Sequence, residues 1–286
     1  MGGGLAERKA VTWPDLFGRV TAHMTGNKSS LDFVVVDESQ DVGVAELRFL
    51  ASLGASRPNG LFFAGDLGQR IFQQPFSWRS LGVDVRGRSY TLRINYRTSH
   101  QIRVQADRLL PPALADVDGN AEDRRGTVSV FNGPAPEIET FDDPEQESEA
   151  VAAWVKGRIE QGVQPHEVGV FVRSPRELRR ARSTLKQAGI QAVELSEKIE
   201  ITTGKVSIGT MHLAKGLEFR AVAVMACDDE IIPSQERMEN VADDVDLEEV
   251  YDSERHLLYV ACTRARDHLL VTGVEPATEF LSDLVA

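Results

Sequence analysis

The sequence predicts an α/β fold built on parallel sheets. Short runs rich in Val, Ile, Leu and Phe alternate along the chain with longer stretches of helical periodicity, which is the order of βαβ units. Several of the runs are apolar throughout, as parallel strands are when helices cover both faces of their sheet. With 286 residues, of which 42% are hydrophobic, the chain is long enough for two modest domains or one large one.

Each predicted strand is a short run rich in β-forming residues. In chain order, we expect strands at 32–37, 60–66, 89–92, 127–131, 167–173, 205–210, 220–226 and 267–273. We expect helices at 44–53, 98–109, 145–161, 175–188 and 252–265. The helix near 175 has the clearest start, because Ser174 can cap it, Pro175 suits the first helical position and Glu177 stands three residues after the serine.

The segments between these elements are rich in Pro, Gly and acidic residues. Residues 111–126 are typical of a loop, and residues 133–145 are typical of a loop around a short strand. The acidic stretch 234–250 is predicted to be a solvated excursion rather than a site. The stretch "DVRGR" separates one set of strands and helices from the next, so we expect a domain boundary near 86–90.

The composition narrows the class of protein without deciding its partner. The net charge of -12 argues against a surface adapted everywhere to a polyanion. Basic residues cluster at 86–108 and 173–186, however, so the net charge does not exclude nucleic acid as a partner. Cys227 and Cys262 lack metal-type spacing and are predicted to be buried, reduced thiols. No apolar run approaches the roughly 20 residues that span a bilayer, and the first ten residues do not resemble a signal peptide. We therefore expect a cytoplasmic protein without a membrane partner.

The most informative stretch is "LDFVVVDESQDV", in which an apolar strand stops at Asp37 and Glu38. Ligands bind at the carboxyl edge of parallel sheets, where one carboxylate can hold Mg²⁺ and its neighbour can deprotonate an attacking water. The next strand also ends in polar residues, at Asp66 and Gln69, which suggests a shared pocket. The alternative for the first pair is a helix cap, made by Asp37 or Ser39.

Three later stretches carry further candidates. "TLRINYRTSHQI" sets Tyr96 beside Arg97, an aromatic face next to a cation, and "GTMHLAKGLEFRAVAV" joins two strands through a polar turn. "ERHLLYVACTRARDHLLV" places Arg264 and Arg266 after an apolar helix. For these two arginines, compensation of the negative end of the helix is the alternative interpretation.

These stretches resemble a known family. "VVVDESQD", "FFAGDLGQRIF", "TLRINYR", "VSIGTMHLAKGLEF" and "LLYVACTRARDHL" are similar, in order and approximate spacing, to motifs II to VI of superfamily 1 helicases. The UvrD/Rep branch is the most similar. The resemblance covers residues from about 32 to 272, nearly the whole chain.

The resemblance implies two RecA-like P-loop NTPase sheets that bind ATP and Mg²⁺. It makes Asp37 the Mg²⁺ ligand, Glu38 the general base, Gln69 the γ-phosphate sensor and Asp66 the residue that shapes the sensor loop. The other nucleotide-site residues that it implies are Tyr96 for the adenine, Gly216 and Glu218 for the nucleotide and its ribose, and Arg97 and Arg264 for the γ-phosphate.

The resemblance also implies contacts with single-stranded and duplex DNA. Thr210 and His212 are similar to the residues along the single-strand track, and Trp78 to the aromatic residue on which a base stacks. Nine positions separate Gln69 from Trp78, more than is usual in the family. Phe72 or Phe76 is therefore an alternative for the stacking residue.

The chain departs from the family by lacking a P-loop. The nearest stretch, "TGNKSS" at 25–30, has Asn27 and Ala22 where the motif requires glycine, and it precedes a strand instead of joining a strand to a helix. We therefore expect a chain cut from a longer protein, whose N-terminal portion is its missing partner. The expected domains are the end of a first RecA-like domain at 1–88 and a complete C-terminal helicase domain at 89–286. A small insertion is expected at about 111–165, because little room separates Arg97 from the fifth motif.

Three functional hypotheses follow. The first is a fragment, inactive alone, of an ATP-dependent DNA helicase or translocase that unwinds DNA 3′ to 5′ in repair or recombination. The second is a naturally P-loop-less protein that binds nucleic acid or a partner without ATPase activity. The third is an unrelated α/β enzyme that uses Asp37 and Glu38 as an acid–base pair. The sequence does not predict an oligomeric state.

Overall fold

The computed structural model describes residues 11–24, 31–54, 57–71, 76–85, 87–119, 121–123, 126–196, 198 and 200–285. The chain divides into two compact units. Unit 1 comprises 1–91 and 114–122, and unit 2 comprises 92–113 and 123–286. The stretch 25–30 and Phe72 lie outside the described residues, as do the first ten residues.

Unit 1 is built on two short parallel strands, β1 (Val34–Val36) and β2 (Leu61–Phe63), with Val35 opposite Phe62. The helix α3 (Val44–Gly54) connects them, and α2 (Trp13–Met24) packs on α3 through the rings of Phe17 and Phe49. Short 3-10 helices, η1 (Ser39–Asp41) and η2 (Leu67–Gln69), follow the two strands, and η3 (Arg79–Leu81) lies further along. The strands β4 (Ala113–Ala115) and β5 (Ala121–Asp123) pair with each other as a two-stranded sheet.

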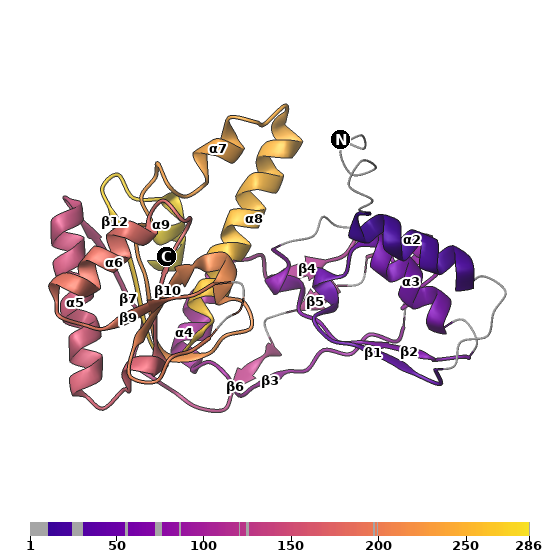
Figure 1. Cartoon of the computed structure of the whole chain (residues 1–286), viewed down its shortest axis with the longest axis horizontal. Helices are drawn as coiled ribbons and strands as arrows, with labels where there is room; N and C mark the ends of the chain where they lie inside the picture. Colours follow the sequence, from indigo (N-terminus) through magenta and orange to yellow (C-terminus); the bar gives the residue numbers. More distant parts are fainter. Residues whose placement is uncertain are drawn as a thin grey trace. The chain divides into compact units, whose positions relative to one another are not determined.

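Unit 2 is built on a six-stranded parallel sheet (Figure 1). Its strand order is β7 (Glu137–Phe141), β12 (Ala265–Val274), β11 (Phe219–Val224), β8 (Val168–Val172), β10 (Val206–Thr210) and β9 (Ala192–Glu194). A separate parallel pair joins β3 (Ile94–Asn95) to β6 (Val128–Ser129). The predicted α/β fold with parallel sheets is confirmed.

Helices cover both faces of this sheet (Figure 1). One face carries α5 (Pro144–Glu160) and α6 (Leu178–Gln187), and the other carries α4 (His100–Ala106), α8 (Asp244–Cys262) and α9 (Glu279–Val285). The short η4 (Asp107–Leu109) follows α4, η6 (Pro165–Glu167) precedes β8, η7 (Met211–Ala214) follows β10, and α7 (Gln235–Met238) precedes α8. None of the described helices is long and apolar enough to cross a membrane.

The central strand β8 shows how the core forms. All five of its residues are buried, because alternate side chains point to opposite faces and helices cover each face. Val168, Val170 and Val172 belong to the core beneath α5 and α6. Phe171 alternates with these valines and points to the opposite face, where its ring packs edge-on against that of Phe219 at a centroid distance of 5.7 Å.

Gly169 leaves the space that these two rings occupy. A Cβ atom at this position would lie 2.7 Å from the Phe171 ring and 3.1 Å from the Phe219 ring. We expect Gly169→Ala to lower the free energy of unfolding by about 1–3 kcal/mol, because it overpacks the core. Urea denaturation measures this change. Gly157→Ala is the matched control, since its Cβ meets nothing within 4 Å in the last turn of α5, and it should be neutral or stabilising.

Most predicted elements are present, and the two thiols are free and buried as predicted. The strand predicted at 89–92 is wrong. Tyr90 and Leu92 are almost fully exposed, no described strand pairs with this stretch, and pairing begins only at Ile94. The predicted loop 111–126 contains β4 and β5, and α2, β9 and α9 were not predicted.

Three boundaries differ from the predictions for local physical reasons. The helix predicted from 175 begins at Leu178, because Ser174 bonds to the Glu177 carboxylate and backbone within a preceding turn. The helix predicted at 252–265 begins at Asp244, where Asp243 caps it by accepting from two backbone amides, so part of the predicted solvated stretch is helical. Within the segment expected to be an insertion, β7 and α5 belong to the main sheet of unit 2 and its covering layer.

Candidate functional site

In unit 1, Asp37 and Glu38 directly follow β1, and both side chains are exposed. Glu38 has a positive φ of 50°, a sparsely populated conformation for a residue with a side chain. Its backbone N–H donates to Asp37 Oδ1 at 2.9 Å. The short helix η1 that follows has Glu38 at its N-cap without a side-chain hydrogen bond, and α3 begins only at Val44. Neither Asp37 nor Ser39 caps either helix, so the capping alternative is wrong.

A buried amide ties the two strand ends of unit 1 together. Gln40 donates from Nε2 to Glu38 Oε2, and its Oε1 accepts from the backbone N–H of Asp66 at 3.0 Å. Asp66 in turn accepts from Gly68 N and from Gln69 Nε2, at 2.8 and 2.9 Å. The structure therefore brings Asp37, Glu38, Asp66 and Gln69 to one edge of the strand pair. Gln40 was not predicted, although it stands two positions after Glu38.

The predicted stacking residue Trp78 belongs to an aromatic cluster in unit 1. Its ring lies 5.0 Å from the Phe63 ring and 5.6 Å from the Phe76 ring, and both Trp78 and Phe76 are partly exposed. The two residues therefore occupy the same place on the unit. The other alternative, Phe72, lies outside the described residues.

In unit 2, three stretches that are far apart in the sequence meet where β11 and β12 begin. Arg97 Nε lies 3.3 Å from Glu218 Oε2, and both side chains are 47% exposed. Thr98 Oγ1 donates to the backbone carbonyl of Thr263 at 3.3 Å. Tyr96 is largely exposed next to Arg97. Gly216 has a φ of 79°, which suits glycine in the turn before Glu218.

Arg264 is buried at this edge, with only 1% of the residue exposed. Its Nε donates to the Val260 carbonyl at 3.0 Å, in the last turn of α8, and Nη1 donates to the Leu217 carbonyl at 3.4 Å. These bonds compensate the end of the helix, as the alternative interpretation held for this residue.

Arg266 behaves differently from Arg264. Its Nε and Nη2 donate to the Asp267 carboxylate at 2.8 and 2.9 Å. This hydrogen-bonded pairing raises the pKa of Arg266 and lowers the pKa of Asp267. Arg220 donates to the same carboxylate at 2.9 Å, so Asp267 is the acceptor for two arginines.

Thr210 and His212 lie at the opposite edge of the same sheet. Thr210 ends β10, whereas Phe219 and Ala265 begin β11 and β12, and parallel strands begin at one edge and end at the other. The structure therefore separates the predicted DNA residues of unit 2 from the predicted nucleotide residues. Burial, and then the charge of Arg173, lower the pKa of His212, so the imidazole is neutral at pH 7 and offers hydrogen bonds rather than a positive charge.

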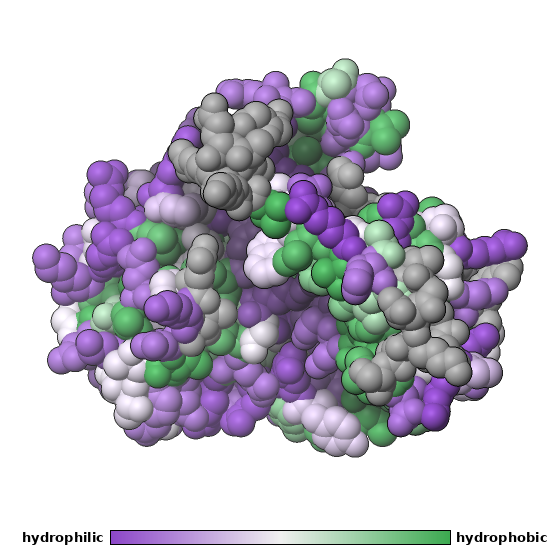
Figure 2. Space-filling model, turned by 45° about the vertical axis from the view of Figure 1, so that its right-hand side comes forward, coloured by the Kyte–Doolittle hydropathy of each residue, from purple (hydrophilic) through white to green (hydrophobic). Residues whose placement is uncertain are grey.

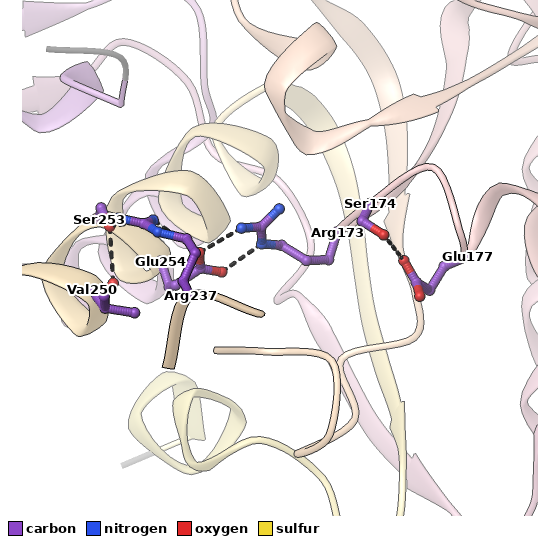
Figure 3. A network of polar contacts seen from close by, with 7 residues as sticks. All are labelled: Arg173, Ser174, Glu177, Arg237, Val250, Ser253 and Glu254. Carbon is purple, nitrogen blue, oxygen red and sulfur yellow. Dashed lines mark hydrogen bonds and ion pairs between the residues drawn. The ribbon is translucent and has the colours of Figure 1, made fainter. Parts of the chain in front are cut away.

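An ion-pair network that the sequence did not predict joins α8 to the residue that follows β8 (Figure 3). The buried carboxylate of Glu254 accepts from Arg173 Nε and Nη2, both at 2.5 Å, and from Arg237 Nη1 at 3.1 Å. Arg173 directly follows β8, and its position after a buried strand is the one sequence feature that could have marked it as a candidate site residue. No sequence feature marks Glu254 on α8, because its partners come from distant parts of the chain.

The donor set in unit 1 suits a metal that arrives with its substrate. No group of three or more His, Cys, Asp and Glu side chains that could hold a metal occurs among the described residues. Mg²⁺ typically takes one or two carboxylates together with substrate phosphates and waters. The exposed carboxylate of Asp37, with Glu38 beside it, fits that requirement.

Outside these sites, hydrophilic and hydrophobic side chains alternate over the surface. Hydrophilic side chains cover most of the face drawn in Figure 2, and hydrophobic side chains are exposed there in separate areas. Large apolar side chains exposed within unit 1 include Val35 and Phe62, from the middle of β1 and β2.

Comparison with known proteins agrees with the motif-based prediction. Residues 193–275 match the family described as UvrD-like helicase C-terminal domain. A probable DNA helicase of Mycoplasma pneumoniae is 25% identical over 259 residues, covering 86% of this chain and 44% of the relative. The ATP-dependent DNA helicase PcrA of Bacillus subtilis is 34% identical over 89 residues, covering 30% of this chain and 11% of the relative.

The comparison with solved structures gave the C-terminal domain of a possible DNA helicase from Lactobacillus plantarum. It is 22% identical, with a TM-score of 0.46, over 66% of this chain and 94% of that one. The chain thus spans less than half the length of the helicases that it matches. The predicted resemblance to UvrD-like helicases is confirmed.

Proposed function

Taking residues 193–275 as a UvrD-like helicase C-terminal domain, we propose that this chain is the motor portion of an ATP-dependent DNA helicase or translocase. In this proposal, ATP hydrolysis drives movement along single-stranded DNA and unwinding of duplex DNA. The polarity is 3′ to 5′, and the role is in DNA repair or recombination. The rest of the nucleotide site, including the phosphate cradle, comes from the N-terminal portion of the same protein.

The observation that carries the proposal is the convergence at the edge of unit 2 where β11 and β12 begin. Arg97, Glu218 and Arg264 come from three separate motifs, yet Arg97 pairs with Glu218 and Arg264 bonds to the residue before Glu218. Arg264 also compensates the end of α8, but Arg97 and Glu218 form a half-exposed ion pair that contributes little stability, so the fold does not require all three side chains at one sheet edge. A nucleotide site does need them, with arginines for the phosphates and a carboxylate for the ribose.

The carboxylates of unit 1 supply the other half of the chemistry. Mg²⁺, bound with ATP through Asp37, would neutralise charge on the phosphates. Glu38 accepts the proton of the attacking water, and Gln40 holds its carboxylate in place. Gln69, oriented by Asp66, bonds the terminal phosphate without adding negative charge. Tyr96 and Gly216 complete the nucleotide site in unit 2.

DNA contacts are assigned to a different set of residues. Thr210 and His212 lie at the far edge of the unit 2 sheet from Glu218, so DNA and nucleotide occupy opposite edges of that unit. Trp78 in unit 1 offers an aromatic face on which a base of any type can stack.

Activity measurements on the full-length gene product test the proposal. We expect ATP hydrolysis that single-stranded DNA accelerates, together with binding of single-stranded DNA by the 286-residue chain itself. The chain by itself should hydrolyse no ATP. Binding to oligonucleotides of different sequence should be similar and should weaken steeply with salt.

Each outcome separates the candidate functions. DNA binding without ATP turnover by the full-length product would favour the alternative of a helicase-like binding protein without ATPase activity. Absence of both DNA binding and turnover would overturn the proposal. Turnover by the 286 residues alone, abolished by Glu38→Gln, would show that the phosphate cradle need not come from elsewhere.

A further inference from the structure

Asp118 holds the turn that carries Trp78. Its carboxylate accepts from Ser77 Oγ at 2.5 Å and from the backbone N–H of Arg79 at 3.0 Å, and these two residues flank Trp78 in the sequence. Asp118 is about forty positions further along the chain, within 114–122, the segment that belongs to unit 1 although the residues before and after it belong to unit 2. A carboxylate from a distant segment thus bonds to the side chain of the residue before one tryptophan and to the backbone of the residue after it.

The turn is also closed from within. The Trp78 carbonyl accepts from Leu81 N at 3.1 Å and from Val83 N at 3.0 Å. Ser77 Oγ, which donates to Asp118, accepts from Ser80 N at 3.0 Å. The Ser77 hydroxyl therefore links Asp118 by hydrogen bonds to the short helix η3 that follows Trp78.

Asp118 is itself oriented by its own loop. Its backbone N–H donates to Asp116 Oδ1 at 3.0 Å, and Gly119 N donates to the Asp116 carbonyl at 3.1 Å. Gly119 has a φ of 79°, which lets the chain turn directly after Asp118. The Ser77 hydroxyl, and then the Arg79 amide, lower the pKa of Asp118, so the carboxylate is ionised and accepts both bonds at neutral pH.

We propose that Asp118 is a positioning residue for single-strand binding, which presents the Trp78 ring, already ordered, to an unpaired nucleic-acid base. The inference rests on the proposed function, because it takes Trp78 as the stacking residue. A ring fixed before binding avoids the cost of ordering its loop when the base arrives, and this raises affinity without a new contact to DNA. Asp118 touches no ligand in this role and acts only through Trp78.

The sign of the effect distinguishes this role from simple electrostatics. Removing a negative charge from a protein that binds a phosphodiester chain should strengthen binding or leave it unchanged. Loss of the clamp should weaken binding instead. The matched control is Asp32→Asn, which removes the same charge from unit 1 at an exposed carboxylate paired with Arg57.

The test measures binding of the 286-residue chain to an oligothymidylate and to the same strand with one 2-aminopurine, whose fluorescence reports stacking. We expect Asp118→Asn and Ser77→Ala to weaken binding roughly 3- to 10-fold and to reduce the stacking signal. Asp32→Asn should bind as tightly as the unmodified chain, or more tightly. Circular dichroism of each variant should be unchanged, because the clamp lies in a surface turn.

A double-mutant cycle completes the test. In a Trp78→Ala background, Asp118→Asn should produce no further loss, because its effect passes entirely through the ring. Equal losses in both backgrounds would overturn the inference, as would unaltered or tighter binding by Asp118→Asn. If the chain binds DNA but Trp78→Ala has no effect, the inference fails while the proposed function stands. If the unmodified chain binds no single strand, both fail.

Discussion

Replacing Glu254 with alanine should lower the free energy of unfolding by about 3–5 kcal/mol. Glu254 is 1% exposed, and its carboxylate accepts three hydrogen bonds from two arginines. Without it, the buried guanidinium of Arg173 would lose its counter-charge and both of the hydrogen bonds described for it. Leaving a buried charge uncompensated costs more than losing the attraction between the pair. Urea denaturation followed by circular dichroism measures the loss.

Glu236→Ala is the matched control for this prediction. Glu236 also faces an arginine, but at 4.0 Å from Arg176 and with a side chain that is 79% exposed. Exposed pairs of this kind contribute about 0–1 kcal/mol, so the variant should unfold nearly as the unmodified chain does. A loss below about 1 kcal/mol for Glu254→Ala would contradict the view that the network is a structural element of unit 2.

Replacing Glu38 with glutamine should lower the rate of ATP hydrolysis by the full-length gene product about 10²- to 10⁴-fold, the range for loss of a general base. Glutamine keeps the size and the hydrogen-bonding reach of the side chain, including contact with Gln40, but its amide cannot take a proton from water. Nucleotide binding should therefore persist while turnover falls. Steady-state hydrolysis and equilibrium binding of ATP measure the two quantities separately.

Asp32→Asn serves as the control here too, because Asp32 stands just before the same strand that Glu38 follows and pairs with Arg57. It should hydrolyse ATP at the unmodified rate. Unchanged turnover by Glu38→Gln would remove Glu38 from the role of general base. Equal loss of binding and turnover would indicate that the side chain supports the fold of the edge instead.

Local patterns were enough to predict most of the helices and strands. The apolar runs at 167–173, 205–210, 220–226 and 267–273 became the central strands β8, β10, β11 and β12, because parallel strands buried on both faces must be apolar along their length. The strand predicted at 89–92 is wrong: the stretch is Ser-Tyr-Thr-Leu rather than a continuous apolar run, and no described strand pairs with it. Helix starts were the least predictable feature, since they depend on caps such as Asp243.

The sequence by itself determined the fold class, the family resemblance and the positions of the polar residues that end the strands of unit 1. The tertiary structure alone decided how residues of distant segments are placed in unit 2 and around Trp78. It placed Glu218 and His212 at opposite edges of one sheet, buried Arg264 against its own helix, and brought Asp118 to the turn of Trp78. The physical reason is distance along the chain. Helix and strand periods act over a few residues, whereas these contacts depend on strand order and on the path of distant segments, which no local pattern encodes.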